Sequence, residues 1–328
     1  MKTRPVGILG TGSYVPERVL TNHDLEKMVD TSDEWIFTRT GMRERRIVAP
    51  EQATSDLCIA AGRRALEDAG VLPESIDLII VATVTPDQYV PSTACFVQKA
   101  LECRGAMALD INAACPGFVT ALTLGTAMVE SGRSERALVI GGECMSRITN
   151  YEDRSSCILF GDGSGAVVLS PDAPRGRILE SFLGADGNGV ETMYIRAGGS
   201  RNPITHERID ARDHKLVIKG NETYKFAVEK FRELVERQMQ QHALTAEDFG
   251  LVVPHQVNYR IIESALRKLD FPEERIFMNL EKYGNTSGAS VGIALDEARR
   301  AGRLVEDKYV SLLAFGAGLT WGSVLLRW

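Results

Sequence analysis

Long apolar runs are missing from this sequence. Its 328 residues contain no stretch close to the ~20 consecutive apolar residues that a membrane helix needs. The first apolar segment, Val6–Gly10, is too short for the core of a signal peptide and is typical of a first strand. We therefore expect a cytoplasmic protein that has no membrane partner.

An excess of basic residues is also missing. Lysine and arginine number 38 against 44 aspartates and glutamates, which gives a net charge of -6. A protein that wraps nucleic acid usually carries a basic surface, so we expect no nucleic-acid partner. A local basic patch that receives an acidic partner is still compatible with this total.

Cysteine is sparse. Six cysteines occur, and none belongs to a C-x-x-C pair, so we expect no zinc or other metal site and no redox motif. Six in a chain of this length are too few for a disulfide scaffold, which favours reduced thiols. One thiol is then available as a nucleophile, and the others are expected to be small buried side chains.

Apolar, strand-like runs alternate with helical patterns along the chain. Several runs consist almost entirely of Val, Ile and Leu, which is typical of strands covered on both faces. This alternation predicts an α/β protein with a mostly parallel, buried sheet. The expected strands are Val6–Gly10, Leu78–Thr83, Ala108–Ile111, Ala137–Gly141, Ala166–Ser170, Gly250–Val253, Tyr309–Phe315 and Ser323–Arg327. The expected helices are Ser55–Ala69, Ser92–Leu101, Phe118–Ser131, Asn221–Gln241, Tyr259–Leu269 and Ser287–Ala301.

Two parts of the chain resemble each other at long range. The glycine turns 160–163 and 315–318 each precede an apolar run, and the layout of 73–83 recurs at 245–254. Chance echoes occur in any α/β protein, but we favour an internal duplication into two halves, 1–172 and 173–328. The turn-rich segment 171–176 is the expected hinge, and the polar, glycine-rich segment 184–219 is expected to be an irregular insertion.

Cys115 lies where a predicted strand ends and a helix begins. Pro116 favours the first helical position, which places Cys115 at or near the N-cap. The positive end of a helix favours a thiolate, so we expect a lowered thiol pKa. A buried structural cysteine is the alternative. Small neighbours leave room for a substrate at the sulfur, and this context favours a nucleophile.

His255 and Asn285 are the other two candidates. His255 follows the expected strand 250–253, and the carboxyl ends of strands are where sites of α/β proteins gather. Asn285 follows Gly284 and, taken alone, is equally an ordinary turn residue.

These candidates stand in three motifs that together resemble one family. The motifs are Ala114-Cys115-x-Gly117-Phe118, Val253-Pro254-His255-Gln256-x-Asn258 and Tyr283-Gly284-Asn285-Thr286-Ser287. In order and spacing the chain resembles β-ketoacyl-acyl carrier protein synthase III, the initiating condensing enzyme of dissociated fatty acid synthesis. The resemblance covers nearly the whole chain. It implies the thiolase-like fold, a duplicated five-layer αβαβα sandwich.

The resemblance also implies an acyltransferase that works through an acyl-Cys115 intermediate. Such an enzyme takes an acyl group from acyl-CoA, condenses it with malonyl-acyl carrier protein and needs no separate cofactor. His255 and Asn285 are then expected to donate hydrogen bonds to an enolate. Elongating synthases have a second histidine in place of the asparagine. Thiolases have a later catalytic cysteine, and no cysteine follows Cys157 here.

A second pair of donors is implied for the tetrahedral intermediate. By resemblance these are the backbone N–H groups of Cys115 and Ala317. The family more often has glycine at position 317 and a small non-proline residue at position 116. Neither departure removes one of the two donors.

Contacts with CoA carry over by position. Trp35 is expected to stack on the adenine, Arg39 to meet phosphate and Arg154 to cover the other face of the base. Ser155 stands where the family usually has glycine after that arginine. Asn258 is expected to contact the pantetheine arm. Without the resemblance, an ordinary half-buried core aromatic residue is the favoured interpretation of Trp35.

A basic patch is expected on the helix after His255. Positions 260, 264, 267 and 268 share one helical face. An acidic carrier protein is the expected partner, and an ordinary solvated helix face is the alternative. The basic residues of the patch are Lys225, Arg260, Arg267 and Lys268.

The acyl pocket is expected to involve Val90, Met145 and Phe160. The resemblance places Val90 in the partner subunit's pocket of a homodimer, where members restricted to short primers carry a bulky aromatic residue. Val90 is smaller and Met145 is flexible, so we expect primers longer or more branched than acetyl.

Two other functions remain open. Some relatives belong to secondary metabolism and use other acyl groups or pass them to oxygen or nitrogen. A non-catalytic subunit of the same fold is less favoured, because Cys115, His255 and Asn285 are all present.

Overall fold

The first half of the chain forms a five-stranded sheet in the order β5-β4-β6-β7-β1. β5, β4 and β6 are parallel, and β7 and β1 are each antiparallel to the strand before them. The computed structural model describes residues 4–328. The bounds of these strands are β1 Gly7–Tyr14, β4 Leu78–Ala82, β5 Met107–Ile111, β6 Ala137–Glu143 and β7 Gly163–Ser170.

The second half repeats this arrangement in the order β11-β12-β13-β8. β11 and β12 are parallel, and β13 and β8 follow antiparallel. A parallel bridge from Val252 to Ile276 takes the place of β5 beside β4. The two predicted glycine turns lead into the equivalent strands β7 and β13. The bounds are β8 Arg177–Ala185, β11 Phe249–Pro254, β12 Tyr309–Gly316 and β13 Thr320–Arg327.

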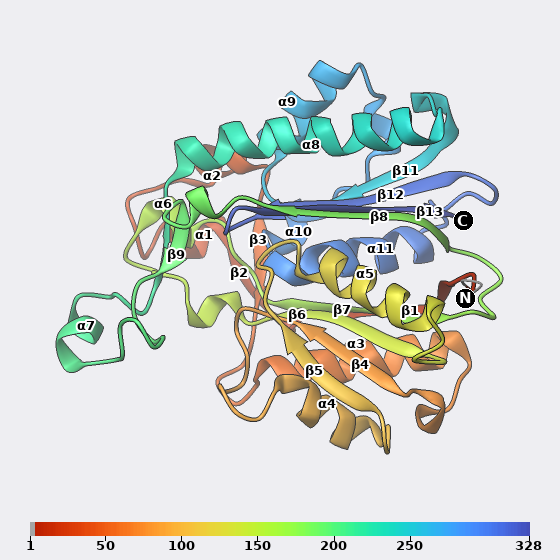
Figure 1. Ribbon diagram of the computed structural model, residues 1–328. Coiled ribbons are helices and arrows are strands. Elements are labelled where there is room, and N and C mark those ends of the chain that lie inside the picture. The colour runs from red at the N-terminus through yellow and green to blue at the C-terminus, as the bar shows by residue number, and fades with distance from the viewer. Residues whose placement is uncertain (1–3) are drawn as a thin grey trace.

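Helices fill the layers between and outside the two sheets (Figure 1). A single register pair, Gly7 with Arg177, joins β1 to β8, and beyond it the sheets separate and enclose α5 and α11. α3 and α4 cover one outer face, and α8 and α9 cover the other. The predicted five-layer αβαβα sandwich is therefore confirmed. The bounds are α3 Thr54–Ala69, α4 Thr93–Leu101, α5 Gly117–Glu130, α8 Gly220–His242, α9 Tyr259–Leu269 and α11 Ser290–Arg300.

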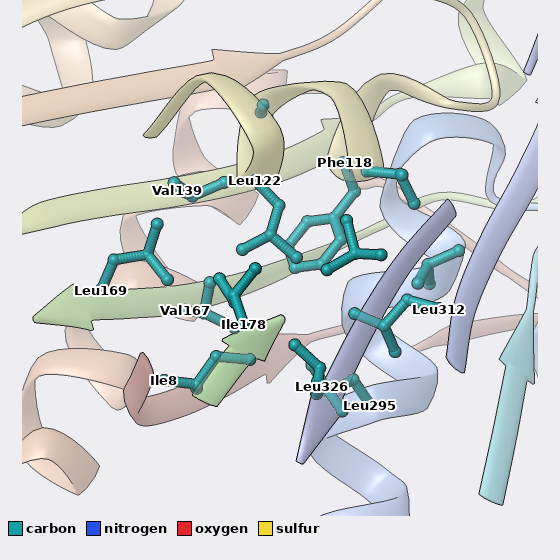
Figure 2. Close-up of a cluster of buried hydrophobic side chains, with 14 of the residues drawn as sticks. Ile8, Phe118, Leu122, Val139, Val167, Leu169, Ile178, Leu295, Leu312 and Leu326 are labelled. Carbon is teal, nitrogen blue, oxygen red and sulfur yellow. The ribbon is translucent and has the colours of Figure 1, made fainter. Parts of the chain in front are cut away.

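The central layer is the main core. Phe118 and Leu122 of α5 and Leu295 of α11 pack against apolar side chains of both sheets, among them Val139 and Leu312 (Figure 2). Burying an aliphatic or aromatic side chain of this size stabilises the fold by roughly 1.5–3 kcal/mol. This packing holds α5, which begins just after Cys115, as a rigid element.

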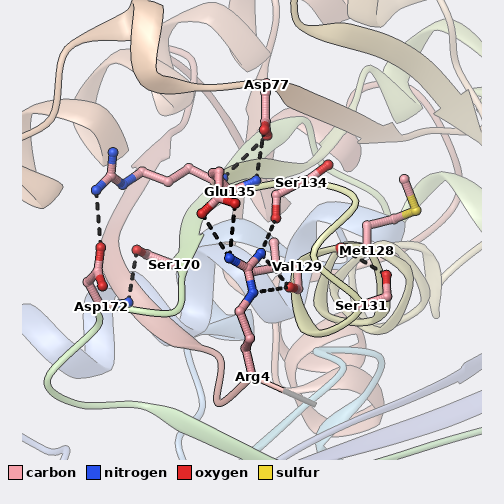
Figure 3. Close-up of polar contacts among 10 residues, drawn as sticks. Arg4, Asp77, Met128, Val129, Ser131, Ser134, Glu135, Ser170 and Asp172 are labelled. Atoms are coloured by element: carbon pink, nitrogen blue, oxygen red, sulfur yellow. Dashed lines mark hydrogen bonds and ion pairs between the residues drawn. The ribbon is translucent and has the colours of Figure 1, made fainter. Parts of the chain in front are cut away.

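The far end of α5 is held by Arg4 (Figure 3). The Arg4 guanidinium donates to the carbonyl oxygens of Val129 at 3.0 Å and Ser134 at 2.9 Å, and it pairs with Glu135 at 2.9 Å. A cation is favoured at the C-terminal end of a helix, where the dipole is negative. The helix is thus fixed at the end opposite the candidate nucleophile.

Shorter elements lie outside the layers. β2 and β3 form a small antiparallel sheet, and β9 and β10 form another within the segment that the sequence predicts to be irregular. The bounds are α1 Asn22–Leu25, α2 Asp33–Thr40, α6 Arg154–Cys157, α7 His206–Asp210, α10 Leu280–Tyr283, β2 Arg18–Thr21, β3 Glu44–Ile47, β9 Met193–Ile195 and β10 Leu216–Ile218.

Every predicted strand and helix has a counterpart, but four details are corrected. The sheet is not mostly parallel, because three pairings between neighbouring strands are parallel and five are antiparallel. β1 continues past Gly10 to Tyr14. β8 is not predicted, because its exposed and charged positions hide the apolar pattern. The helix expected from Ser287 begins only at Ser290, because Ser287 has a φ of +47° and lies in a short 3-10 turn.

All six cysteines are free thiols, and all except Cys95 are buried, as expected. Within residues 4–328, no helix is long and apolar enough to cross a membrane. The same residues contain no group of three or more His, Cys, Asp or Glu side chains that is arranged to hold a metal ion.

Candidate active site

Loops from both halves meet at the carboxyl ends of the parallel strands, as is usual for sites in α/β folds. Cys115 follows β5, His255 follows β11 and Ala317 follows β12. A Cβ placed on Gly316 would meet Cys115, while the ring of the preceding Phe315 lies 6.1 Å from the His255 ring. The end of β12 therefore lies between the predicted cysteine and histidine.

Cys115 lies on a tight turn between β5 and α5. Ala114 has a φ of +51°, and the Gly117 N–H donates to the Ala114 carbonyl oxygen at 2.8 Å. Pro116 is itself the N-cap and α5 begins at Gly117, so Cys115 lies one residue before the cap instead of at the predicted cap position. Non-glycine residues rarely adopt positive φ, and those that do are often held in place at functional sites.

The second half of the chain encloses the thiol. Cys115 is 5% exposed, and the Ser287 Oγ lies 3.8 Å from its Sγ. A Cβ on Gly316 would lie 2.8 Å from the Cys115 Cβ and 3.0 Å from its Sγ. Only glycine therefore allows β12 to approach this closely. The sequence places Gly316 in a turn without revealing this contact.

Burial acts against ionisation of this thiol. It raises the pKa of Cys115 to about 12. Two smaller effects are the Ser287 hydrogen bond, which lowers this pKa, and the Glu143 charge, which raises it. The expected lowering of the pKa is wrong for the free protein, because loss of hydration outweighs the favourable helix end.

His255 is fully buried and neutral. Its Nδ1 lies 2.6 Å from the Ser290 Oγ, and its Nε2 has no partner among residues 4–328. Burial lowers the pKa of the imidazole to about 3. Buried polar atoms are normally hydrogen-bonded, so the free Nε2 is a natural place for a substrate atom.

Asn285 is held by its main chain, and its amide nitrogen has no hydrogen-bond partner among residues 4–328. Its N–H donates to the Leu159 carbonyl oxygen at 2.8 Å, and its own carbonyl accepts from the Gly161 N–H at 3.1 Å. The Asn285 Oδ1 accepts from the Ser287 N–H at 2.8 Å. Gly284 has a φ of +63°, and a Cβ there would lie 2.6 Å from the Leu159 oxygen. This geometry explains the glycine that precedes Asn285.

Two backbone N–H groups complete the candidate set. Within the described part of the chain, the Cys115 and Ala317 N–H groups donate to no other residue. The Thr320 Oγ1 lies 2.8 Å from the Ala317 carbonyl oxygen and 3.2 Å from that of Ala113, which ties the two loops together. Ala317 does not have a positive φ, so its Cβ is tolerated.

A carboxylate that is not predicted from the sequence lies behind this site. Glu143 ends β6 and is fully buried. Its Oε2 accepts from Thr83 at 3.1 Å and Thr85 at 2.7 Å, and its Oε1 accepts from the Gly288 N–H at 3.3 Å. Burial raises the pKa of Glu143 to about 7. A charged residue at the end of an apolar run is the only signal in the sequence.

Most of the predicted CoA residues gather beside α2. The guanidinium carbons of Arg39 and Arg154 lie 4.7 Å and 4.8 Å from the centre of the Trp35 ring. Asn258 is the N-cap of α9, where its Oδ1 accepts from the Arg260 N–H at 2.9 Å. A pocket of about 400 Å³ at this place is lined by Ser32, Glu34, Trp35, Thr38, Arg39 and Arg260.

The predicted basic patch lies on α9 and the first turns of α8. Arg267 pairs with Glu263 at 2.9 Å, which offsets part of its charge. Arg260 donates to the Thr38 carbonyl oxygen at 3.0 Å and lines the pocket beside Trp35. Arg260 therefore belongs to both predicted surfaces. The four exposed basic residues are Lys225, Arg260, Arg267 and Lys268.

Two of the three predicted pocket residues lie together. Met145 and Phe160 are each 2% exposed and form one cluster with Leu216 of β10. The segment predicted to be irregular thus contributes Leu216 to this buried cluster. Val90 is 81% exposed and lies outside this cluster.

Two family models match the chain. The model for 3-oxoacyl-[acyl-carrier-protein] synthase III matches residues 109–187, and the model for the C-terminal part of that family matches residues 239–328. Among solved structures, 3-oxoacyl-[acyl-carrier-protein] synthase III from Aquifex aeolicus VF5 is 43% identical with a TM-score of 0.90. That match covers 98% of this chain and 100% of the other.

Full-length relatives agree with these matches. The beta-ketoacyl-[acyl-carrier-protein] synthase III of Caldanaerobacter subterraneus subsp. tengcongensis is 52% identical over 98% of this chain and 97% of the relative. The protein of the same name from Symbiobacterium thermophilum is 50% identical over 100% of this chain and 99% of the relative. With such identity over its full length, the chain belongs to the beta-ketoacyl-[acyl-carrier-protein] synthase III family.

Proposed function

We propose that the chain condenses an acyl-CoA primer with malonyl-acyl carrier protein to give 3-oxoacyl-acyl carrier protein, which initiates fatty acid synthesis. The observation that carries this proposal is one enclosed thiol, Cys115, near two unpartnered backbone donors. His255 and Asn285 each add a free nitrogen in the adjoining loops. Membership of a family named for this synthase supports it.

Acyl loading is the first half-reaction. The Cys115 sulfur attacks the thioester carbonyl, a new C–S bond forms, and CoA leaves as its thiol with the proton from Cys115. The N–H groups of Cys115 and Ala317 are proposed to stabilise the oxygen of the tetrahedral intermediate. The covalent intermediate divides a difficult transfer into two easier steps.

Condensation is the second half-reaction. The malonyl group loses carbon dioxide, and the electron pair of the broken C–C bond forms an enolate. His255 Nε2 and Asn285 Nδ2 are proposed to donate to its oxygen. For Nε2 to carry the proton, Nδ1 has to accept from the Ser290 hydroxyl, which lies 2.6 Å away and is able to donate. The enolate carbon then attacks the acyl carbonyl and Cys115 leaves.

CoA is proposed to enter beside Trp35. The adenine has to displace the Arg154 guanidinium, because that group rests on the Trp35 ring. The displacement is small in cost, since the other interactions of Arg154 are an exposed hydrogen bond to the Asp30 carbonyl oxygen at 2.8 Å and an exposed ion pair with the Asp30 carboxylate at 4.0 Å. Arg39 is proposed to meet phosphate. Asn258 keeps its Nδ2 for the pantetheine arm, because its cap uses only Oδ1.

The carrier-protein patch is testable with a double variant. Arg267→Ala/Lys268→Ala is expected to raise the KM for malonyl-acyl carrier protein severalfold at low salt, because exposed cations steer an acidic partner. The effect should fade with added salt, since charges are screened over about 8 Å near physiological ionic strength. Acyl loading, measured by intact mass, should barely change. Arg260 is left intact because it also lines the CoA pocket.

Arg63→Ala/Lys99→Ala is the matched control. It removes the same two charge types from exposed positions on α3 and α4, in the opposite outer layer (Figure 1). If both double variants behave alike at low salt, the α9 patch has no part in carrier-protein binding.

We also propose a homodimer. β5 is an edge strand on which Met107 is 47% exposed. Tyr89 and Val90 project from a loop with 82% and 81% exposure. Unpaired strand edges and exposed apolar groups are typically covered by a partner. In such a dimer, Val90 of one subunit would reach the acyl pocket of the other subunit.

Primer length is testable through Val90. Primers longer than acetyl are expected to be preferred. Each additional buried methylene contributes about 0.8 kcal/mol to binding, which changes the preference severalfold per carbon until the pocket is full. Val90→Phe should shift the preference toward acetyl-CoA, whereas Val305→Phe, at another exposed valine, should not. Competition between acetyl-CoA and four- to eight-carbon acyl-CoAs measures this. A strict acetyl preference in the wild type, unchanged in Val90→Phe, contradicts it.

A priming role in secondary metabolism is the second candidate. The priming beta-ketosynthase of the R1128 polyketide pathway is 35% identical with a TM-score of 0.90, over 99% of this chain and 97% of the other. Intact-mass measurement with a panel of acyl-CoAs, followed by malonyl-acyl carrier protein, tests both. Discharge of short primers to 3-oxoacyl products supports the first proposal, and loading without discharge supports another acceptor. A chain that takes no acyl group would be a non-catalytic subunit.

The remaining proposals follow from the same observations. The halves 1–172 and 173–328 are proposed to derive from one duplicated unit, supported by their matching strand order. A cytoplasmic location is supported by six unpaired thiols, which persist in a reducing compartment. No group beyond the two substrates is needed in either half-reaction.

A further inference from the structure

Glu143, the last residue of β6, faces the turn formed by residues 285–288. Gly288 packs directly on it, since a Cβ there would lie 3.0 Å from the Glu143 Oε1 and 3.1 Å from the Ala114 carbonyl oxygen. A Cβ on Gly141 of β6 would meet the Gly288 oxygen at 2.3 Å. The turn with Asn285 and Ser287 is thus pressed against the end of β6.

The Glu143 carboxylate accepts only from hydroxyl and N–H groups. Besides the Gly288 N–H at 3.3 Å, these include the Val84 N–H at 3.1 Å and the Thr85 hydroxyl at 2.7 Å. A backbone N–H cannot reverse its polarity, so Gly288 and Val84 require an acceptor at this place. Protonation removes the charge that strengthens these hydrogen bonds, and a proton on Oε1 would directly face the Gly288 N–H.

Loosening of the 285–288 turn would affect the reacting atoms, because Ser287 of this turn contacts both Cys115 and Asn285. The Ser287 hydroxyl next to Gly288 lies 3.8 Å from the Cys115 sulfur, and the Ser287 N–H orients the Asn285 amide. We propose that Glu143 is a positioning residue for condensation, which holds the 285–288 turn as a carboxylate and loosens it when protonated. This inference rests on the proposed function and adds a residue to it.

Glu143 is the group near this turn that changes charge close to neutral pH. Burial raises the pKa of its carboxyl to about 7. Cys58, Cys115 and Cys144 feel its charge, but burial raises their pKa values well above the neutral range. The pKa of His255 is lowered to about 3, so the imidazole stays neutral. Because the raised pKa leaves the carboxyl about nine-tenths protonated at pH 6, condensation should fall up to about tenfold between pH 8 and pH 6.

Glu143→Gln tests the inference with a side chain of the same shape that does not ionise. The rate of condensation at pH 8 should fall by about 10- to 100-fold, because a displacement of a reacting group by up to about 1 Å costs this much. When the acyl-enzyme is formed beforehand, so that the pH dependence of loading does not enter, the fall in condensation between pH 8 and pH 6 should disappear. Alkylation of Cys115 by iodoacetamide should become faster, because losing a nearby negative charge lowers the thiol pKa.

Three further variants separate positioning from stability. Glu143→Asp keeps the charge and should restore part of the rate and the acidic fall. Thr85→Val removes the hydroxyl that most favours the ionised form and should move the acidic fall to higher pH. Asp296→Asn, at a buried carboxylate that accepts from Thr11 and Ser13 at 2.6 Å, should keep the wild-type pH profile.

The outcomes are distinct. If the rate of condensation by Glu143→Gln still falls between pH 8 and pH 6, the inference is overturned. So does an equal loss of alkylation and condensation together with a lowered Tm, which marks a merely structural residue. Alkylation needs neither acyl-CoA nor carrier protein. Absence of condensation in the wild type therefore counts against the proposed function, while unchanged alkylation in Glu143→Gln counts against this inference.

Discussion

Cys115→Ala is expected to remove every acyl adduct from the protein and to abolish condensation. Loss of a covalent nucleophile typically costs about 10⁴- to 10⁶-fold in rate. The variant should fold normally, because it removes only a sulfur atom beside Gly316 and Ser287. Intact mass after incubation with acyl-CoA measures the adduct, and thermal unfolding checks the fold.

Cys95→Ala is the matched control. Cys95 is the one thiol of the six that is not buried, so acylation that merely follows accessibility would fall on it. The control should load fully. Adducts that persist on Cys115→Ala but vanish on Cys95→Ala would reject Cys115 as the acceptor.

The raised pKa of Cys115 adds a pH signature to loading. With a thiol pKa of about 12, the thiolate fraction rises about tenfold for each pH unit below that value. Loading should therefore climb through pH 7–9 without reaching a plateau. A plateau near pH 8 would show that bound acyl-CoA, or the helix end, lowers the pKa by several units.

The fold can be predicted from the sequence because most of its buried strands are continuous apolar runs. The runs 78–83 and 250–253 became the equivalent parallel strands β4 and β11, and the recurring glycine turns precede the equivalent strands β7 and β13. β8 was not predicted because most of its side chains are exposed or only partly buried, at the junction of the two sheets. Such strands depend on their neighbours more than on their own pattern.

The site is only partly readable. Cys115, His255 and Asn285 stand in recognisable motifs. Ser290, which binds His255, and Glu143, which binds Gly288, come from segments that carry no motif of their own. The direction of the thiol pKa shift was also wrong, because helix position can be inferred from the chain while desolvation depends on the second half folding over the sulfur.

Asn285 is expected to separate the two half-reactions. Asn285→Ala removes a donor to the enolate, and loss of one such donor typically costs about 10²- to 10³-fold. Condensation should fall by that factor, while loading from acyl-CoA continues, because the tetrahedral oxygen of loading is assigned to the backbone N–H groups of Cys115 and Ala317. Acyl-enzyme should accumulate, measured by intact mass, and fail to discharge to malonyl-acyl carrier protein.

Asn285→Asp makes the assignment specific to the amide nitrogen. The aspartate keeps an oxygen for the Ser287 N–H, which Asn285 now binds at 2.8 Å, and so preserves the turn. It loses the NH₂ donor and brings a negative charge toward a developing enolate. If the donor matters, both variants lose condensation, and aspartate is no better than alanine. If Asn285 serves only to shape the turn, aspartate should restore most of the rate, and an equal loss of loading in both variants would refute the division of labour.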